Sequence, residues 1–200
     1  MAHRFVNQRQ LDALIRGELD ALQANGPVSD VAEPGVIFPG AFNPLHDGHR
    51  QLAAVAAGLL KIRVEYEISI RNVDKVPASA AEIQTRLAQF ERHHVVWLTC
   101  SNTFVKKARV FHQPTFLVGV DTIQRVADVS YYGDSHSGRD EAIDQLRERR
   151  CRFLVFGRLL DGPFQQLENC ELPSQLLEIC EGVPETVFRL DISSRQLRGF

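Results

Sequence analysis

The chain has 200 residues, of which 44% are hydrophobic and 24% charged, with a formal net charge of -2 and a pI near 6.4. This length favours one domain with a sizeable core. The balance of charge excludes a general attraction for a nucleic-acid backbone or an anionic membrane. We therefore expect no nucleic-acid partner and no membrane partner, and any phosphate binding must come from a local site.

Cysteine usage and the N-terminal residues both favour the cytoplasm. The four cysteines are widely spaced and contain no C-x-x-C pair; they are Cys100, Cys151, Cys170 and Cys180. Reduced thiols are expected from such spacing, rather than a disulfide framework or a metal site. Residues 1–25 lack the apolar stretch and cleavage site of a signal peptide. The sequence thus predicts a cytoplasmic protein.

The first predicted element is an amphipathic helix over residues 7–24, in which Leu11, Leu14 and Leu22 fall near helical spacing. Residues 25–27 read Asn-Gly-Pro and end this helix, and turn formers follow up to Gly35. We therefore divide the chain into an N-terminal helix and linker, residues 1–34, and a main domain, residues 35–200.

Short apolar segments then alternate with helical patterns. Strands are predicted over 36–38, 62–70, 95–98, 115–120, 151–156 and 186–190, and helices over 49–60, 80–90, 102–111, 121–127, 140–150 and 173–180. Two glycines, two serines and a histidine predict a mobile loop over residues 132–139.

This alternation implies right-handed crossovers and a parallel sheet. The predicted fold is therefore α/β: a Rossmann-like, doubly wound, mostly parallel sheet with helices on both faces, plus the N-terminal helix. In such a sheet the ligand binds at the carboxyl ends of the strands.

The segment after the first of these strands, residues 40–49, reads G-A-F-N-P-L-H-D-G-H. Gly40 allows the backbone to approach a ligand closely. His46 and His49 begin a helix, where unpaired N–H groups and the helix dipole favour phosphate. Two imidazoles there can bridge triphosphate oxygens and stabilise charge during in-line attack. The alternative interpretation is a turn histidine and a helix-capping residue.

Two later segments also end strands with polar groups. Residues 191–198 read D-I-S-S-R-Q-L-R, in which Ser193 and Ser194 suit a helix N-cap and Arg198 suits phosphate oxygens. The alternative is a capped terminal helix with solvated arginines. Asp121 follows Gly119 at a strand end, where a carboxylate can bind ribose hydroxyls or an amine, or cap a helix.

Together these segments resemble the nucleotidylyltransferase superfamily. Residues 40–49 are similar to its G-x-F-[DN]-P-x-H-x-G-H signature, and residues 192–198 to its I-S-S-T-x-[IL]-R motif, with Arg195 in place of the threonine. The resemblance implies that His46 and His49 contact the triphosphate and stabilise the transition state. It also implies nucleotide or phosphate contacts for Gly40, Ala41, Phe42, Asn43, Ser193, Ser194 and Arg198.

Residues 36–198 most resemble nicotinate and nicotinamide mononucleotide adenylyltransferases, including the module fused to CinA-type amidase domains. Residues 67–77 are similar to the E-x-S-x-x-N-x-D-K-P-P stretch of that group, which implies acceptor contacts for Asn72 and Lys75. Residues 103–108 are similar to a helix near the acceptor, so that Lys106 or Lys107 would meet its phosphate. A solvated charged face is the alternative for these two lysines. Asp121 and Arg158 take nucleotide-binding roles by the same resemblance.

The hypothesis that follows is transfer of an adenylyl group from ATP to a small phosphorylated acceptor, nicotinate or nicotinamide mononucleotide, with release of pyrophosphate. Because the sequence shows no clustered carboxylates for a metal site, Mg²⁺ would be held mainly by the ATP phosphates. Two alternatives remain open: a cytidylyltransferase that uses CTP, and a non-catalytic nucleotide-binding regulatory protein. A homo-oligomer, with the N-terminal helix as a contact, is also open.

Overall fold

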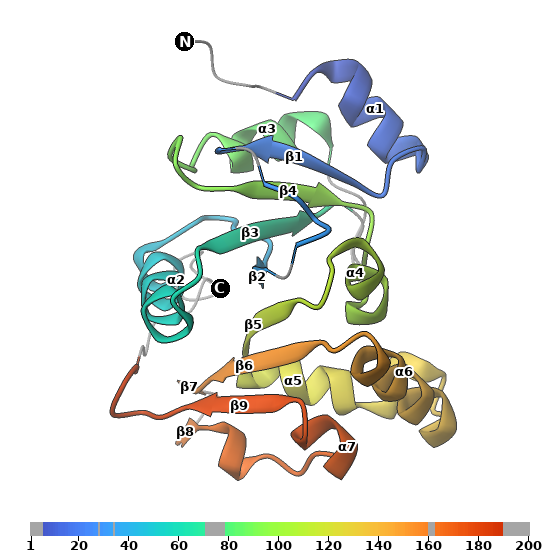
Figure 1. The fold of residues 1–200 in the computed structure, drawn as a ribbon, viewed down its shortest axis with the longest axis vertical. Helices are drawn as coiled ribbons and strands as arrows, with labels where there is room; N and C mark the ends of the chain where they lie inside the picture. The colour runs from blue at the N-terminus through green and yellow to red at the C-terminus, as the bar shows by residue number, and fades with distance from the viewer. Residues whose placement is uncertain (1–5, 28, 34, 71–78, 160–162, 190–200) are drawn as a thin grey trace.

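In the computed structural model, the residues described are 6–27, 29–33, 35–70, 79–159 and 163–189. Seven strands of this part form one sheet in the order β1-β4-β3-β2-β5-β6-β9 (Figure 1). The strands are β1 (Ala21–Asn25), β2 (Val36–Pro39), β3 (Val64–Ser69), β4 (Val96–Thr99), β5 (Thr115–Gly119), β6 (Arg152–Phe156) and β9 (Cys180–Val183). Neighbouring strands are parallel except for β1, which is antiparallel to β4. A short antiparallel pair, β7 (Arg158–Leu159) and β8 (Phe164–Gln165), lies outside this sheet.

Helices cover both faces of the sheet. They are α1 (Gln8–Arg16), α2 (Asp47–Leu60), α3 (Ala80–Leu87), α4 (Phe104–Val110), α5 (Val120–Ala127), α6 (His136–Glu148) and α7 (Ser174–Leu177), with 3-10 turns η1 (Val129–Tyr132) and η2 (Leu167–Asn169). Helices α1 to α3 pack into one hydrophobic core and α4 to α7 into a second core on the other face. The predicted Rossmann-like α/β fold is thus confirmed.

Successive apolar side chains along β5 and β6 point to opposite faces of the sheet and so contribute to both cores. Phe116 and Val118 face the core under α4 to α7, while Leu117 between them faces the other core. Strand β6 divides in the same way, with Phe153 on one side and Leu154 on the other. Strands buried on both faces are expected to be continuously apolar, as these are.

The predicted helix over residues 7–24 is wrong beyond Arg16. Gly17 adopts a left-handed conformation (φ 80°) and donates its backbone N–H to the carbonyls of the last turn of α1, which ends the helix. The chain then enters β1, where Leu22 pairs with Leu98 of β4. A boundary at residue 34 therefore does not separate two structural units, because β1 belongs to the main sheet.

Three further predictions need correction. Residues 132–139 are not one loop, since α6 begins at His136 and Ser135 caps it by accepting the Gly138 N–H at 3.0 Å. The predicted last strand over 186–190 is wrong for its described part, where the N–H of Val187 bonds back to the carbonyl of Pro184 in a turn. The strand that completes this edge is β9, and the predicted helix over 173–180 shortens to α7.

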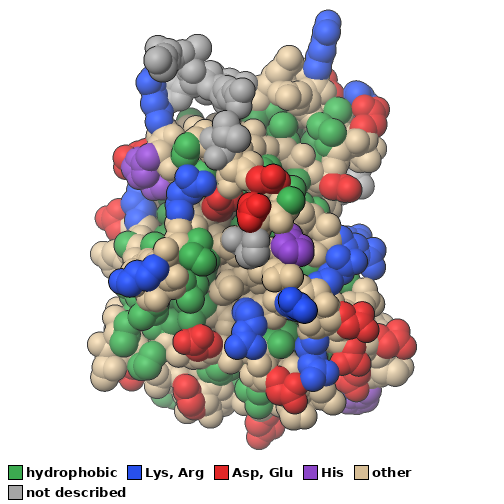
Figure 2. All heavy atoms as spheres, in the orientation of Figure 1, with side chains coloured by type: hydrophobic (Ala, Val, Ile, Leu, Met, Phe, Trp, Pro, Cys, Tyr) green, Lys and Arg blue, Asp and Glu red, His purple; other side chains and the backbone are tan. Residues whose placement is uncertain are grey.

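The surface and the cysteines agree with a globular chain. Lys and Arg side chains are interspersed with Asp and Glu over the face drawn in Figure 2. None of the four cysteines, all within the described residues, forms a disulfide, and burial raises the pKa of Cys151 to about 11 and that of Cys180 to about 12. Within the described ranges, no helix has the length and apolar character needed to span a membrane.

Candidate active site at the switch point of the sheet

The sheet reverses its direction of winding between β2 and β5. From β2 the chain crosses through α2 and α3 on one face, and from β5 it crosses through α5 and α6 on the other. Open α/β sheets bind ligands in the crevice at the carboxyl ends of the strands at such a point. The segments that follow β2, β5 and β6 meet at this edge.

The loop after β2 is shaped by one glycine and one aromatic ring. Gly40 donates its N–H to the carbonyl of Glu67 on β3 at 2.9 Å. Phe42 has a positive φ of 44° and is 1% exposed, and its ring lies against Gly40 so closely that a Cβ there would be 2.7 Å from Cζ. Phe42 also packs edge-on against Tyr66 and Phe90. Glycine at position 40 therefore allows the loop to be anchored in the core.

Gln89, which follows α3, fixes the same loop and was not predicted from the sequence. Its side-chain amide donates to the carbonyl of Phe42 at 3.1 Å and accepts the N–H of Leu45 at 2.8 Å. These two bonds satisfy backbone groups that no regular element pairs. A single glutamine more than 40 positions away carries no local pattern, so the sequence offered no signal for this role.

His46 and His49 lie together at the N-terminus of α2. His46 is the N-cap residue, and the Nδ1 atom of His49 accepts the His46 backbone N–H at 3.3 Å. The two imidazole rings stack with centroids 3.7 Å apart and planes inclined by 28°. Phe42 supports the His49 ring from the core side, edge-on at 5.1 Å. The pair is therefore held at the positive end of the α2 dipole.

The surroundings of this pair disfavour protonation of both imidazoles. Burial, followed by the charges of His46, Arg158 and Arg50, lowers the pKa of His49 to about 3. Burial and the charge of Arg158 also lower the pKa of His46. Positive charge around a half-buried histidine disfavours protonation, and an anion in the same place would reverse this effect. The site is thus electrostatically suited to a phosphate group.

Asp121 and Arg158 join the site from the ends of β5 and β6. Asp121 lies in the first turn of α5 and accepts a hydrogen bond from Arg158 Nη1 at 3.1 Å. Gly119 is the N-cap residue, and a Cβ there would be 2.5 Å from Asp121 Oδ1. Asp121 therefore does not cap the helix; its carboxylate is held by Arg158, whose charge also acts on both histidines.

The two lysines predicted to meet the acceptor differ in position. Lys106 is exposed on α4, which fits either a solvated position or contact with an acceptor. Lys107 is buried: its Nζ lies 2.7 Å from both carboxylate oxygens of Glu67 and 2.8 Å from the Ser101 carbonyl. A direct contact between Lys107 and an acceptor phosphate does not fit this arrangement. Its role is to neutralise Glu67, whose own carbonyl accepts the Gly40 N–H.

Several predicted site residues lie outside the described residues: Asn72, Lys75, Ser193, Ser194 and Arg198. Of the described loop residues, Ala41 and Asn43 are exposed between Gly40 and the histidines. The described residues also contain no group of three His, Cys, Asp or Glu side chains that would hold a metal ion.

Stability in mild acid is expected to depend on His49. Its folded-state pKa of about 3 lies below the ordinary value of 6.5, so the unfolded chain binds one more proton between these values. The contribution of the neutral His49 side chain to the free energy of unfolding is fully present above pH 6.5. It is lost as the pH falls toward 3, by up to about 1.4 kcal/mol per pH unit. Urea unfolding of the wild type and His49→Gln from pH 4 to 7 measures it. Equal pH slopes for the two proteins would contradict the assignment.

Taken together, the strand order, the switch point and a histidine pair at a helix N-terminus define a Rossmann-like protein with a candidate ligand site at the carboxyl edge of its sheet. A family model described as cytidylyltransferase-like matches residues 37–200. The chain therefore belongs to the cytidylyltransferase-like family, within the nucleotidylyltransferase superfamily. A search of curated proteins finds no match.

Proposed function

We propose that this protein is an enzyme that transfers an adenylyl group from ATP to a small phosphorylated acceptor, nicotinate or nicotinamide mononucleotide. Membership of the family supports nucleotidyl transfer in general. The observation that carries the proposal is the stacked pair of imidazoles, His46 and His49, at the N-terminus of α2, where Arg158 acts on both.

The proposed reaction is an in-line displacement. An oxygen of the acceptor phosphate attacks the α-phosphorus of ATP, a new P–O bond forms, and the bond to the pyrophosphate leaving group breaks. His46, His49 and the positive end of the α2 dipole stabilise the charge that builds on the phosphates. Arg158 adds a guanidinium held in place by Asp121. No covalent intermediate on the protein is needed.

The leaving pyrophosphate and the metal are assigned from the resemblance and from chemistry. Ser193, Ser194 and Arg198 match the motif that binds the β- and γ-phosphates in the superfamily. Mg²⁺, when bound with the nucleotide, neutralises phosphate charge and is held mainly by the phosphates themselves. The exposed Lys106 is the described lysine on α4 that remains accessible to an acceptor phosphate.

ATP is preferred over CTP because the Gly119–Asp121 segment and residues 67–77 resemble pyridine-nucleotide adenylyltransferases. CTP is the second candidate, favoured by the cytidylyltransferase-like family match. A binding protein without turnover is the third, favoured by Arg195 in place of the usual threonine.

Pyrophosphate release tests these candidates directly. ATP and CTP are each combined with nicotinate mononucleotide, nicotinamide mononucleotide or phosphopantetheine in the presence of Mg²⁺, with reactions lacking acceptor as controls. We expect acceptor-dependent release with ATP and a mononucleotide. Release with CTP alone would replace the adenylyl assignment, and ATP binding without release from any pair would overturn the proposed activity.

A further inference from the structure

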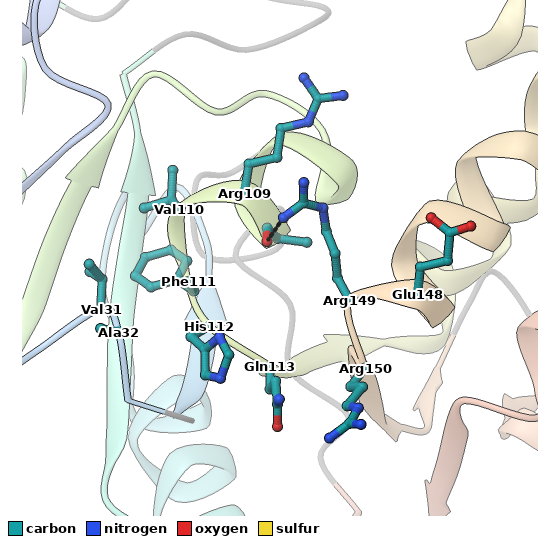
Figure 3. Close-up of a pocket in the computed structure, with 11 residues that line it drawn as sticks. Val31, Ala32, Arg109, Val110, Phe111, His112, Gln113, Glu148, Arg149 and Arg150 are labelled. Atoms are coloured by element: carbon teal, nitrogen blue, oxygen red, sulfur yellow. Dashed lines mark hydrogen bonds between the residues drawn. The ribbon is translucent and has the colours of Figure 1, made fainter.

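A cavity lies at the edge of the sheet opposite the histidine pair. It has a volume of about 430 Å³ and is formed where α4 and α6 end, before β5 and β6 begin (Figure 3). Its lining is an apolar floor with a polar rim: Val31, Ala32, Ala108, Arg109, Val110, Phe111, His112, Gln113, Glu148, Arg149 and Arg150. A volume of this size falls within the range of small-molecule sites.

The rim is rich in positive charge that lacks carboxylate partners. The lining contains three arginines, Arg109, Arg149 and Arg150, and one acidic residue, Glu148, and within the described part of the chain none of the three arginines forms an ion pair. Arg109 donates to the amide oxygen of Gln145 at 3.2 Å, which leaves most of its guanidinium donors free. An unneutralised group of this kind favours an anionic ligand.

Helix ends explain only part of this charge. Basic side chains at helix C-termini are favoured by the dipole. Arg149, which follows α6, extends toward the end of α4 and donates to the Ala108 carbonyl at 3.4 Å (Figure 3). Any basic residue in the last turn of α6 would interact favourably with the helix dipole, and Arg147 already lies there. Arg150 therefore needs another explanation.

Arg150 occupies a backbone position that normally belongs to glycine. Its φ is 55°, and it ends α6 with the Arg150 N–H bonded to the Arg147 carbonyl and the Cys151 N–H bonded to the Leu146 carbonyl. This hydrogen-bond pattern usually places glycine in the left-handed residue, because a Cβ is disfavoured there. The chain thus keeps a guanidinium at this point despite a conformational cost.

A second residue of the rim shares this conformation beside Arg150. Gln113 has a φ of 42°. The hydrogen bond from the Arg152 N–H to the Pro114 carbonyl places the segment that contains Gln113 beside the segment that contains Arg150. Figure 3 shows the side chains of His112, Gln113 and Arg150 extending to the same side. Two strained residues therefore present hydrogen-bond donors together, a pattern that is often found at ligand sites.

We propose that this cavity binds a small phosphate-bearing anion, with Arg150, His112 and Gln113 on one side and Arg109 and Arg149 on the other. Guanidinium groups match phosphate oxygens in geometry and charge. The site is concave and the chain carries a net charge of -2, which favours a small molecule over a nucleic-acid backbone. The inference is independent of the transfer reaction at the other edge of the sheet.

The test uses inorganic pyrophosphate as the probe, at constant ionic strength, followed by amide NMR shifts. We expect saturable shifts for residues 109–113 and 148–151, separable from any at residues 40–49 and 119–121. Arg150→Gly should weaken binding at the first group at least fivefold while leaving the melting temperature unchanged or higher, because glycine relieves the strain. Arg109→Gln, which changes no strained residue, should also weaken it.

Lys61→Gly provides the matched control. Lys61 ends α2 in the same left-handed conformation, with a φ of 56°, and does not line the cavity. Its substitution should have a similar effect on the melting temperature and none on binding. Shifts confined to residues 40–49 and 119–121, or equal affinity in wild type and Arg150→Gly, would overturn the proposal.

Discussion

His49→Ala is expected to lower kcat at least about 100-fold, with a much smaller change in the KM for the nucleotide. Removing one preorganised donor to transition-state charge typically costs about 10² to 10³ in rate. The His49 ring is fixed by Phe42 and by its bond to the His46 N–H, so its geometry is set before the substrate arrives. Steady-state kinetics with the nucleotide and acceptor that turn over measure the effect.

The matched control for this substitution is His136→Ala, because His136 is exposed at the start of α6 and far along the chain from the pair. It should leave kcat unchanged. Circular dichroism of both variants checks that the fold is retained. A rate for His49→Ala within threefold of the wild type would remove His49 from the catalytic machinery.

Lys107→Met is expected to destabilise the protein by about 3–5 kcal/mol, the usual cost of leaving one partner of a buried ion pair alone. Glu67 is 0% exposed and accepts hydrogen bonds from Lys107 and Thr99. Without the ammonium group, its charge would stay in the core with only the hydroxyl to stabilise it. The free energy of unfolding in urea measures the loss.

A double substitution separates the charge from the packing. Glu67→Gln with Lys107→Met removes both charges, so it should recover much of the stability lost by Lys107→Met alone. Arg16→Ala is the control, because it breaks an exposed ion pair with Glu18. It should leave the urea concentration at the unfolding midpoint unchanged within experimental error. If Lys107→Met is as stable as the wild type, the buried ion pair does not contribute as the structure indicates.

The parts of the fold that the sequence predicted best are those with strong local patterns. Strands β2, β5 and β6 are apolar on both faces along most of their length, and Ser79 caps α3 in the expected place. The hydrophobic pattern gave wrong predictions where pairing with a distant strand determines the secondary structure. Leu22 continues the helical spacing of α1, yet it lies in β1 because Gly17 ends the helix and β4 offers an edge. The short strand β9 contains Glu181 and Gly182, which have weak strand propensity, and forms because β6 pairs with it.

The candidate site divides in the same way. His46 and His49 were predicted because both lie within ten residues of Gly40, after a strand and at the start of a helix. Gln89 and the partner of Lys107 could not be predicted, since each contact joins residues about 40 or more positions apart. The sequence shows that two lysines are adjacent on α4 but not which one turns into the core.

The antiparallel strand β1 has a practical consequence for the design of shorter fragments. The family match begins at residue 37, whereas β1 ends at Asn25 and supplies the hydrogen-bond partners of β4. A fragment cut at the family boundary would leave the outer side of β4 as an open row of N–H and C=O groups. Such an edge invites pairing with another chain. Strand β1 therefore covers the edge of β4 against pairing with another chain, as well as extending the sheet.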